Sequence, residues 1–441
     1  MAGINPFRPN YPVVPGMFVG RINELQKLEN HLVQTRAGIP SNFMITGERG
    51  IGKSSLLLYL KALAKGDISF SDKKFKFLVI SLDIEKSTTQ LGLIKRIEFL
   101  LNQELGKTEP ARQFLKDAWD FAKKVEAAGF RLGQVDQVEG NELLQEQFAN
   151  SLGQTVQRIV QPDSGSIFSS KYDGIILLID EADNASKDLN LGSFLKLLLE
   201  RLQRSRVNNL LVGLAGLDEL KTVLTESHPS SMRLFEHLHL ERLGDDEVES
   251  VISIAMEEAS TKNDKKYEVK GDAKKSLISI SEGYPHFIQQ YGYSAFEADS
   301  DDIIDQDDVI EGIFGEHGGM EAIGDRYYRN DFYNKIQKDS YRQVLRIMAS
   351  KLDAWISKKE IRTEFVGKDS TLDNALQALR ERGIIISKEG ERGVYRLQHK
   401  GFAYWIRIFT SNPDELQQTL DTHAAAKSKK ETENTTSGQS E

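Results

Sequence analysis

Nine consecutive residues near the start of the chain have the types and the spacing of a loop that binds phosphate groups. They follow an apolar run and precede an apolar helical pattern, and they are Gly47, Glu48, Arg49, Gly50, Ile51, Gly52, Lys53, Ser54 and Ser55. The glycines let the backbone turn tightly, so that successive N–H groups point at one cluster of phosphate oxygens. The following helix adds the positive end of its dipole. We therefore expect this segment to bind a nucleoside triphosphate.

Two side chains of this loop have separate tasks. Lys53 supplies a positive charge for the β and γ phosphates, and the Ser54 hydroxyl is placed to bind Mg²⁺. Every fixed position of the motif is filled and its flanks are correct, so we prefer this interpretation to a flexible glycine turn. The expected cofactors are ATP and Mg²⁺.

A second motif places two carboxylates at the end of an apolar run. Residues 175–179 are all Ile or Leu, and Asp180 and Glu181 follow them directly. Ligands of parallel sheets bind where the carboxyl ends of the strands meet. We expect Asp180 to hold Mg²⁺ and Glu181 to orient and deprotonate the attacking water. Because a water-activating carboxylate adds nothing to ground-state binding, Glu181 favours hydrolysis over binding alone.

These motifs need a sheet that brings them to one edge. Apolar runs with intervening helical periodicity predict five strands, at residues 42–46, 75–82, 174–179, 210–214 and 236–240. The fold class is therefore α/β, with a doubly wound parallel-sheet P-loop NTPase core. Helical patterns and a β-hairpin follow, which predict a helical lid domain and a C-terminal winged helix-turn-helix.

The expected domain boundaries follow these patterns. Residues 105–171 exceed what one crossover needs and predict an inserted helical hairpin, with helices at 111–126 and 141–160. It is either a partner contact or only a decorated crossover, and we prefer the second interpretation. The expected divisions are an ATPase core at 1–243, a helical lid at 244–335, a winged helix at 336–410 and a polar, disordered tail at 411–441.

The composition limits the classes of protein. A hydrophobic content of 39% and a charged content of 28% are typical of a soluble globular protein. Apolar runs all fall short of the roughly 20 residues that span a bilayer, and the start lacks a signal-peptide core. The chain has no cysteine, which excludes disulfides and cysteine-ligated metals. We expect a cytoplasmic protein with no membrane partner.

The charge is distributed unevenly, and this bears on the last domain. The net charge is −9, yet residues 340–410 hold 14 Lys and Arg against 8 Asp and Glu, a local balance of +6. Lys388 and Arg392 lie at the expected wing tip, where they can meet backbone phosphates. Asn374 and Gln377 lie off the apolar face of the third helix. The balance favours DNA over the alternative, a winged helix that contacts protein.

With these motifs, the chain resembles the AAA+ and STAND-type P-loop ATPases, nearest to the origin-recognition and archaeal-ATPase clades, over about residues 13–410. The two nucleotide motifs match their Walker A and Walker B motifs. Residues 18–25 resemble the box that these families place before the P-loop, and Gly283-Tyr284-Pro285 resembles the glycine-x-proline signature of the STAND lid. The resemblance implies further nucleotide contacts at Phe18, Val19, Arg21, Pro285 and His286.

The resemblance also implies an arginine finger, and the sequence departs from the pattern of these families at two positions. Arg233 stands where these families carry an arginine that reaches the nucleotide of a neighbouring subunit. The polar sensor after the fourth strand is missing, because Gly216 stands there, and His286 replaces the lid arginine. A histidine is mostly uncharged at neutral pH. We therefore expect slow or partner-dependent hydrolysis. His237 and His239 stand two positions apart, as alternation along a strand places them. We prefer this interpretation to a pair of metal ligands.

Three functions fit these observations. The first is an ATP-dependent switch that forms oligomers and binds DNA through the winged helix. The second is a signalling or scaffold ATPase, for example in defence or regulation, whose winged helix contacts protein and whose insertion at 105–171 recognises a partner. The third is a pseudo-ATPase that binds the nucleotide without turning it over. We prefer the first.

Overall fold

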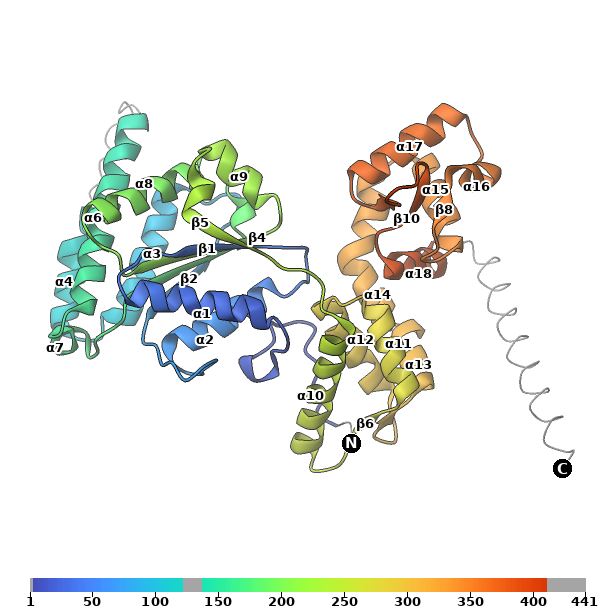
Figure 1. Cartoon of the computed structure of the whole chain (residues 1–441), viewed down its shortest axis with the longest axis horizontal. Coiled ribbons are helices and arrows are strands. Elements are labelled where there is room, and N and C mark those ends of the chain that lie inside the picture. The colour runs from blue at the N-terminus through green and yellow to red at the C-terminus, as the bar shows by residue number, and fades with distance from the viewer. Residues whose placement is uncertain (1–2, 122–136, 411–441) are drawn as a thin grey trace, which may run out of the picture. The chain divides into compact units, whose positions relative to one another are not determined.

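The structure is a computed structural model that describes residues 3–121 and 137–410. The chain forms two compact units, Asn10–Leu243 and Met1–Pro9 together with Gly244–Glu441. Figure 1 shows the elements of both units. The division between lid and winged helix within the second unit stays a prediction, and the tail expected at 411–441 lies outside the described residues.

A five-stranded sheet with the order β2-β3-β4-β1-β5 forms the centre of the first unit. All of its neighbouring strands pair in parallel, so the predicted parallel sheet is confirmed. The order brings the ends of β1, β3 and β4 together, although long stretches of chain separate them. The strands are β1 (Asn42–Thr46), β2 (Leu78–Asp83), β3 (Ile175–Asp180), β4 (Leu210–Gly216) and β5 (Phe235–His239).

Helices cover both faces of this sheet, with α1 and α2 on one face and α8 and α9 on the other (Figure 1). Alternate side chains of the strands, such as Leu177, Ile179 and Val212, pack into one apolar core with α3, α6 and α8. The helices of this unit are η1 (Pro15–Met17), α1 (Ile22–Arg36), α2 (Lys53–Lys65), α3 (Gln90–Leu105), α4 (Glu109–Trp119), α6 (Gln137–Val160), α7 (Ser164–Phe168), η2 (Ala182–Asn184), α8 (Leu191–Arg204), α9 (Leu220–Ser227) and η3 (Ser231–Leu234).

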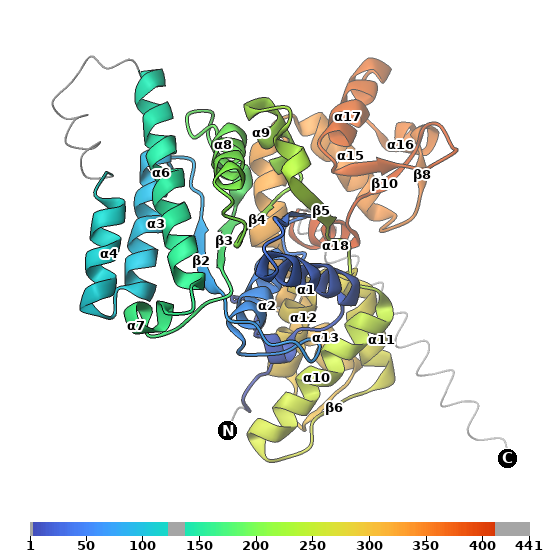
Figure 2. The same ribbon diagram turned by 60° about the vertical axis from the view of Figure 1, so that its left-hand side comes forward.

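The expected insertion contributes α4 and α6, which stand beside α3 (Figure 2). The Trp119 ring is buried and lies 5.8 Å from Phe148, which stacks on Phe194 of α8 at 5.5 Å. These contacts make both helices part of the core of the first unit. The expected connection at 129–140 and the expected end of the first helix at 126 lie largely outside the described residues.

The second unit is mostly helical and contains two small sheets. β6 and β7 pair in parallel, and β10 pairs antiparallel with both β8 and β9. Its elements are α10 (Asp245–Asn263), β6 (Glu268–Val269), α11 (Gly271–Ser281), α12 (Pro285–Ala298), β7 (Ile303–Ile304), α13 (Gln306–Phe314), α14 (Gly319–Ile323), the π-helical turns η4 (Gly324–Tyr328) and η5 (Asp331–Lys335), α15 (Asp339–Ser350), β8 (Ile356–Ser357), α16 (Lys358–Glu364), α17 (Asp369–Glu381), β9 (Ile385–Ser387), β10 (Val394–Leu397) and α18 (Lys400–Phe409).

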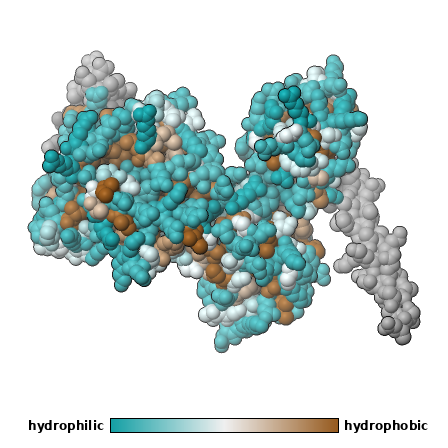
Figure 3. Space-filling view, viewed as in Figure 1, coloured by the Kyte–Doolittle hydropathy of each residue, from teal (hydrophilic) through white to brown (hydrophobic). Residues whose placement is uncertain are grey.

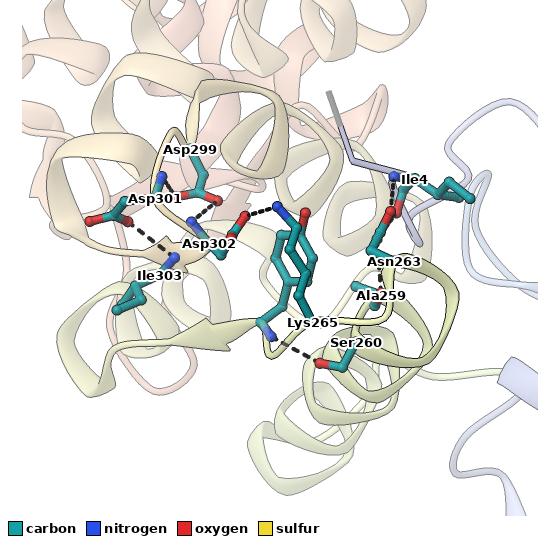
Figure 4. A network of polar contacts seen from close by, with 10 residues as sticks. Ile4, Ala259, Ser260, Asn263, Lys265, Asp299, Asp301, Asp302 and Ile303 are labelled. Carbon is teal, nitrogen blue, oxygen red and sulfur yellow. Dashed lines mark hydrogen bonds and ion pairs between the residues drawn. The ribbon is translucent and has the colours of Figure 1, made fainter. Parts of the chain in front are cut away.

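Residues 3–9 pack within the second unit. The expected division, which placed them in the ATPase core at 1–243, is wrong for this segment. The Ile4 N–H donates to Asn263 Oδ1 at 2.6 Å, and Asn263 Nδ2 donates back to the Ile4 carbonyl at 3.1 Å (Figure 4). Phe7 is only 2% exposed. It fits against Gly292 of α12, where a Cβ atom would lie 2.4 Å from the Phe7 ring. The missing side chain of Gly292 therefore makes room for this segment.

The visible face of the molecule is mostly hydrophilic, and its apolar side chains lie in small groups (Figure 3). Within residues 3–121 and 137–410, every helix is too short or too polar to cross a membrane.

Candidate functional site

The loop between β1 and α2 has the backbone that its glycines predict. Gly50 and Gly52 have φ angles of +80° and +99°, a region that favours glycine. α2 begins at Lys53, so the free N–H groups of its first turn lie beside the loop. Ile51 is buried under the loop, where its Cγ2 would lie 3.0 Å from a Cβ atom on Gly47. Glycines with such φ angles let successive N–H groups of a loop converge on phosphate oxygens.

Lys53 is folded onto its own loop. Its ammonium group donates to the carbonyl oxygens of Gly47 at 2.8 Å and Glu48 at 2.9 Å. Burial lowers the pKa of Lys53, and the carboxylates of Asp180 and Asp183 are the strongest of the groups that oppose this effect. These contacts hold the ammonium group at the loop, within reach of an anion placed above it.

The two predicted motifs meet, although 126 residues separate them. The Ser54 hydroxyl donates to Asp180 Oδ2 at 2.8 Å, and Asp180 Oδ1 accepts from the Glu181 N–H at 2.9 Å. Both metal-ligand candidates therefore lie at one point on the sheet edge. Ser55 has a different contact, because its hydroxyl accepts from the Val13 N–H at 3.1 Å.

Glu181 has a strained backbone and a perturbed carboxyl group. Its φ of +50° is rare for a residue with a side chain, and it turns the chain sharply out of β3. Partial burial of its carboxyl group, with the charges of Asp180, Asp83 and Asp183, raises the pKa of Glu181, while Arg49 opposes the shift. A carboxylate with a raised pKa is a better proton acceptor, as a general base requires.

Asp183 fills the space in which a side chain on Gly216 would stand. A Cβ atom at Gly216 would lie 2.5 Å from Asp183 Oδ1 and 3.1 Å from the Asp183 backbone nitrogen. Asp183 Oδ1 in turn accepts from the Leu217 N–H at 3.0 Å. The sensor missing from the sequence is therefore also excluded by packing.

The box before the P-loop is held by Arg21. This residue is 7% exposed with a φ of +59°, and its guanidinium donates to the carbonyls of Ile51, at 3.2 Å, and Glu241. Phe18 packs on Tyr59 of α2, with ring centroids 5.2 Å apart. Arg21 therefore ties the box to the P-loop. Val19 is half-buried in the same segment.

The remaining predicted residues belong to other elements of the two units. Pro285 and His286 begin α12 in the second unit, where Tyr327 Oη lies 2.9 Å from His286 Nδ1 and Arg326 donates to His286 Nε2 at 3.0 Å. Arg233 is exposed on η3 of the first unit.

The predicted DNA contacts are on α17 and between β9 and β10. Asn374, Gln377 and Arg392 are exposed, and Lys388 pairs with Glu391 at 2.5 Å. Gln377 Nε2 donates to Glu381 at 2.8 Å.

Comparisons with known proteins find a family that the first unit resembles. Residues 17–212 match the family described as AAA ATPase domain. The matched residues include both nucleotide motifs. No curated protein sequence matches the chain.

Solved structures share the fold at low sequence identity. The ORC2 protein of Aeropyrum pernix, in ADPNP-ADP complexes, aligns with a TM-score of 0.53 and 14% identity, over 96% of this chain and 100% of that chain. Cdc6p of Pyrobaculum aerophilum gives a TM-score of 0.45 at 14% identity, over 94% and 98% of the two chains. A RuvB mutant of Thermotoga maritima gives 0.41 at 13%, over 88% and 95%.

Sequence reasoning missed two features of the site. Asp183 belongs to neither predicted motif, yet it fills the space in which a side chain on Gly216 would stand. The second feature is the group of polar side chains around Thr46, which come from β5 and from the turn after β4. The strand register could have pointed to one of them, because Thr46 pairs with His239.

Proposed function

We propose that this chain is an ATP-dependent switch that binds Mg²⁺ and ATP at the P-loop and hydrolyses ATP slowly. The observation that carries this proposal is the contact between Ser54 and Asp180, at 2.8 Å. It joins the two motifs that phosphoryl-transfer sites use for the metal ion. The AAA ATPase domain family supports the same class of activity.

The residues at this contact fit Mg²⁺. An octahedral Mg²⁺ holds its oxygen ligands at roughly 2.0–2.1 Å, so that neighbouring ligands lie roughly 2.9 Å apart. Ser54 Oγ and Asp180 Oδ2 have about this separation. In the described part of the chain, no group of three or more His, Asp or Glu side chains could hold a metal. Bound at Ser54 and Asp180, Mg²⁺ would neutralise charge on the phosphates.

Two other side chains would act on the nucleotide and the water. Lys53 would exchange its bonds to the loop carbonyls for bonds to phosphate oxygens. Glu181 would accept a proton from the attacking water, as its position beside Asp180 and its raised pKa favour. Hydrolysis is expected to be slow because Gly216 offers no side chain to the reacting phosphate.

A neighbouring copy of the chain is the proposed source of an arginine finger. The Arg233 side chain is exposed, and no ion pair holds it within residues 3–121 and 137–410. An exposed arginine that forms no ion pair in the described part of its own chain is available to a nucleotide on another copy. Turnover per molecule is then expected to rise with protein concentration.

Two variants test the ATPase proposal. Lys53→Ala is expected to lose ATP binding in calorimetry, because the main cation of the loop is removed. Glu181→Gln should retain ATP affinity within a few-fold and lower turnover by about 10² or more, the usual contribution of a general base. Retained affinity in Lys53→Ala would contradict the P-loop assignment. Unchanged turnover in Glu181→Gln would remove that residue from catalysis and favour another base.

We further propose that residues 336–410 form a winged helix that binds DNA. The order of α15, β8, α16, α17, β9 and β10 is that of a winged helix, and the charge of +6 over residues 340–410 supports an anionic partner. A protein partner is the second candidate. One observation favours it, because exposed carboxylates of α17, Asp369 and Asp373, form ion pairs with Arg362 and Lys358 of α16 and so reduce the free positive charge there.

The two candidates differ in their response to salt. The full chain is expected to bind a duplex at low salt, and the double variant Lys388→Ala/Arg392→Ala should bind about tenfold more weakly with a smaller salt dependence. The matched control is Arg204→Ala/Lys266→Ala, which removes two cations that are 78% and 80% exposed and lie outside the wing. Equal weakening in both variants would indicate a general charge effect. No binding at low salt would favour the protein partner.

A further inference from the structure

Polar side chains gather around Thr46, the residue that directly precedes the P-loop. Thr46 is the last residue of β1 and pairs with Gly216 of β4 on one side and with His239 of β5 on the other. Paired residues of parallel strands point to the same face of a sheet. Gly216 has no side chain, so of these two paired residues only His239 of β5 places a polar side chain level with Thr46.

The Thr46 hydroxyl organises this group. It is buried and lies 2.8 Å from Asp218 Oδ1, 2.8 Å from His237 Nε2 and 3.2 Å from His239 Nδ1. A hydroxyl has one proton, which it donates here to the carboxylate, so both imidazoles must donate their N–H groups to its lone pairs. His239 Nδ1 is also 3.3 Å from Asp218 Oδ1. The ring of His239 is thus fixed through Nδ1, and its Nε2 is left for a ligand.

His239 also borders a space beside the loop. His239 and Asp218 line a pocket of about 360 Å³ together with Glu48 of the P-loop, whereas His237 is not among its lining residues. The charges of Glu48 and Asp218 also act on the ammonium group of Lys53. The pocket therefore adjoins the part of the loop that is expected to hold the terminal phosphates.

We propose that His239, positioned by Thr46 and Asp218, is the side chain with which this ATPase distinguishes ATP from ADP. The proposal rests on the proposed binding of ATP at the P-loop. In its charged form the ring shares its Nδ1–H group between Thr46 and Asp218 and donates its Nε2–H group to an oxygen of the γ-phosphate, the group that ADP lacks. From the other side of β1, His239 thus supplies the polar side chain that Gly216 does not have.

Calorimetry with the full chain, Mg²⁺, and either AMP-PNP or ADP tests this proposal. His239→Ala is expected to weaken AMP-PNP binding about tenfold, the effect of losing one charge-assisted hydrogen bond, while ADP affinity changes less than about twofold. His239→Gln, which keeps a donor without the charge, should fall between. The matched control is His237→Ala, which removes the other imidazole from Thr46 without changing the pocket, and should affect both nucleotides equally.

Each outcome of these measurements supports or overturns a different part of the proposal. An unchanged ratio of AMP-PNP to ADP affinity in both His239 variants would overturn the role of His239 while the ATPase proposal stands. The same change of ratio in His237→Ala would show that the network, and not His239, sets the preference. A wild-type chain that binds neither nucleotide would overturn the proposed function itself. Circular dichroism of each variant separates these outcomes from misfolding.

Discussion

Replacing Gly216 by alanine tests how the sheet edge beside the nucleotide motifs is packed. The added methyl carbon would lie 2.5 Å from Asp183 Oδ1, 3.1 Å from its backbone nitrogen and 3.3 Å from its Cγ. Non-bonded carbon atoms pack at roughly 3.5–4.0 Å, so the shortest contact is about 1 Å too close. Since one of the three contacts is to backbone, rotation of the Asp183 side chain alone cannot relieve the overlap.

The expected cost follows from two effects. Inserting a methyl group into a packed site costs about 1–3 kcal/mol. Moving the carboxylate away breaks its hydrogen bond with the Leu217 N–H, at 3.0 Å, and a hydrogen bond to a charged group contributes about 1.5–3 kcal/mol. We expect Gly216→Ala to destabilise the first unit by about 3 kcal/mol, which lowers its melting temperature by roughly 6–12 °C.

The measurement is thermal unfolding of the full chain, with hydrogen exchange to locate the change in the first unit. Gly165→Ala is the matched control, because a Cβ atom there meets nothing within 4 Å and α7 tolerates alanine. In the double variant Asp183→Ala/Gly216→Ala the methyl group loses its contacts with Oδ1 and Cγ and keeps only the looser one with the backbone nitrogen, so the two changes should couple by more than about 1 kcal/mol. A Gly216→Ala variant as stable as the control, or additive changes in the double variant, would refute the reasoning.

Two other predictions concern the base and the N-terminal segment. The raised pKa of Glu181 keeps its carboxyl group protonated up to a higher pH than an ordinary glutamate. As the pH is lowered, kcat/KM should therefore begin to fall at a higher pH than it would with an ordinary glutamate as the base. In Asp183→Asn one of the repelling charges is lost, so this fall should move to lower pH in the pH–rate profile, and an unmoved profile would contradict the assignment. Phe7→Ala should destabilise the second unit by about 3 kcal/mol in urea unfolding, since the ring is 2% exposed. Ile4→Ala is its control because Ile4 is 54% exposed, and equal effects would show that Phe7 does not anchor the segment.

The core sheet was predictable because each strand is a short apolar run between helical patterns. All five strands lie within three residues of their predicted starts, and their parallel pairing is confirmed. The packing of residues 3–9 was not predictable in the same way. Phe7 and the prolines around it have no periodicity, and their place beside Gly292 depends on packing with residues almost 300 positions away.

The sequence by itself determined the phosphate-binding loop and its acidic partner motif. Such a loop binds through backbone N–H groups, which requires glycines at set positions, and the φ angles of Gly50 and Gly52 show why no other residue suits them. The tertiary structure decided which side chains surround the loop. The strand order places β4 and β5 on either side of β1, and the register then sets Gly216 and His239 level with Thr46. Order and register depend on packing between distant segments, which no local pattern records.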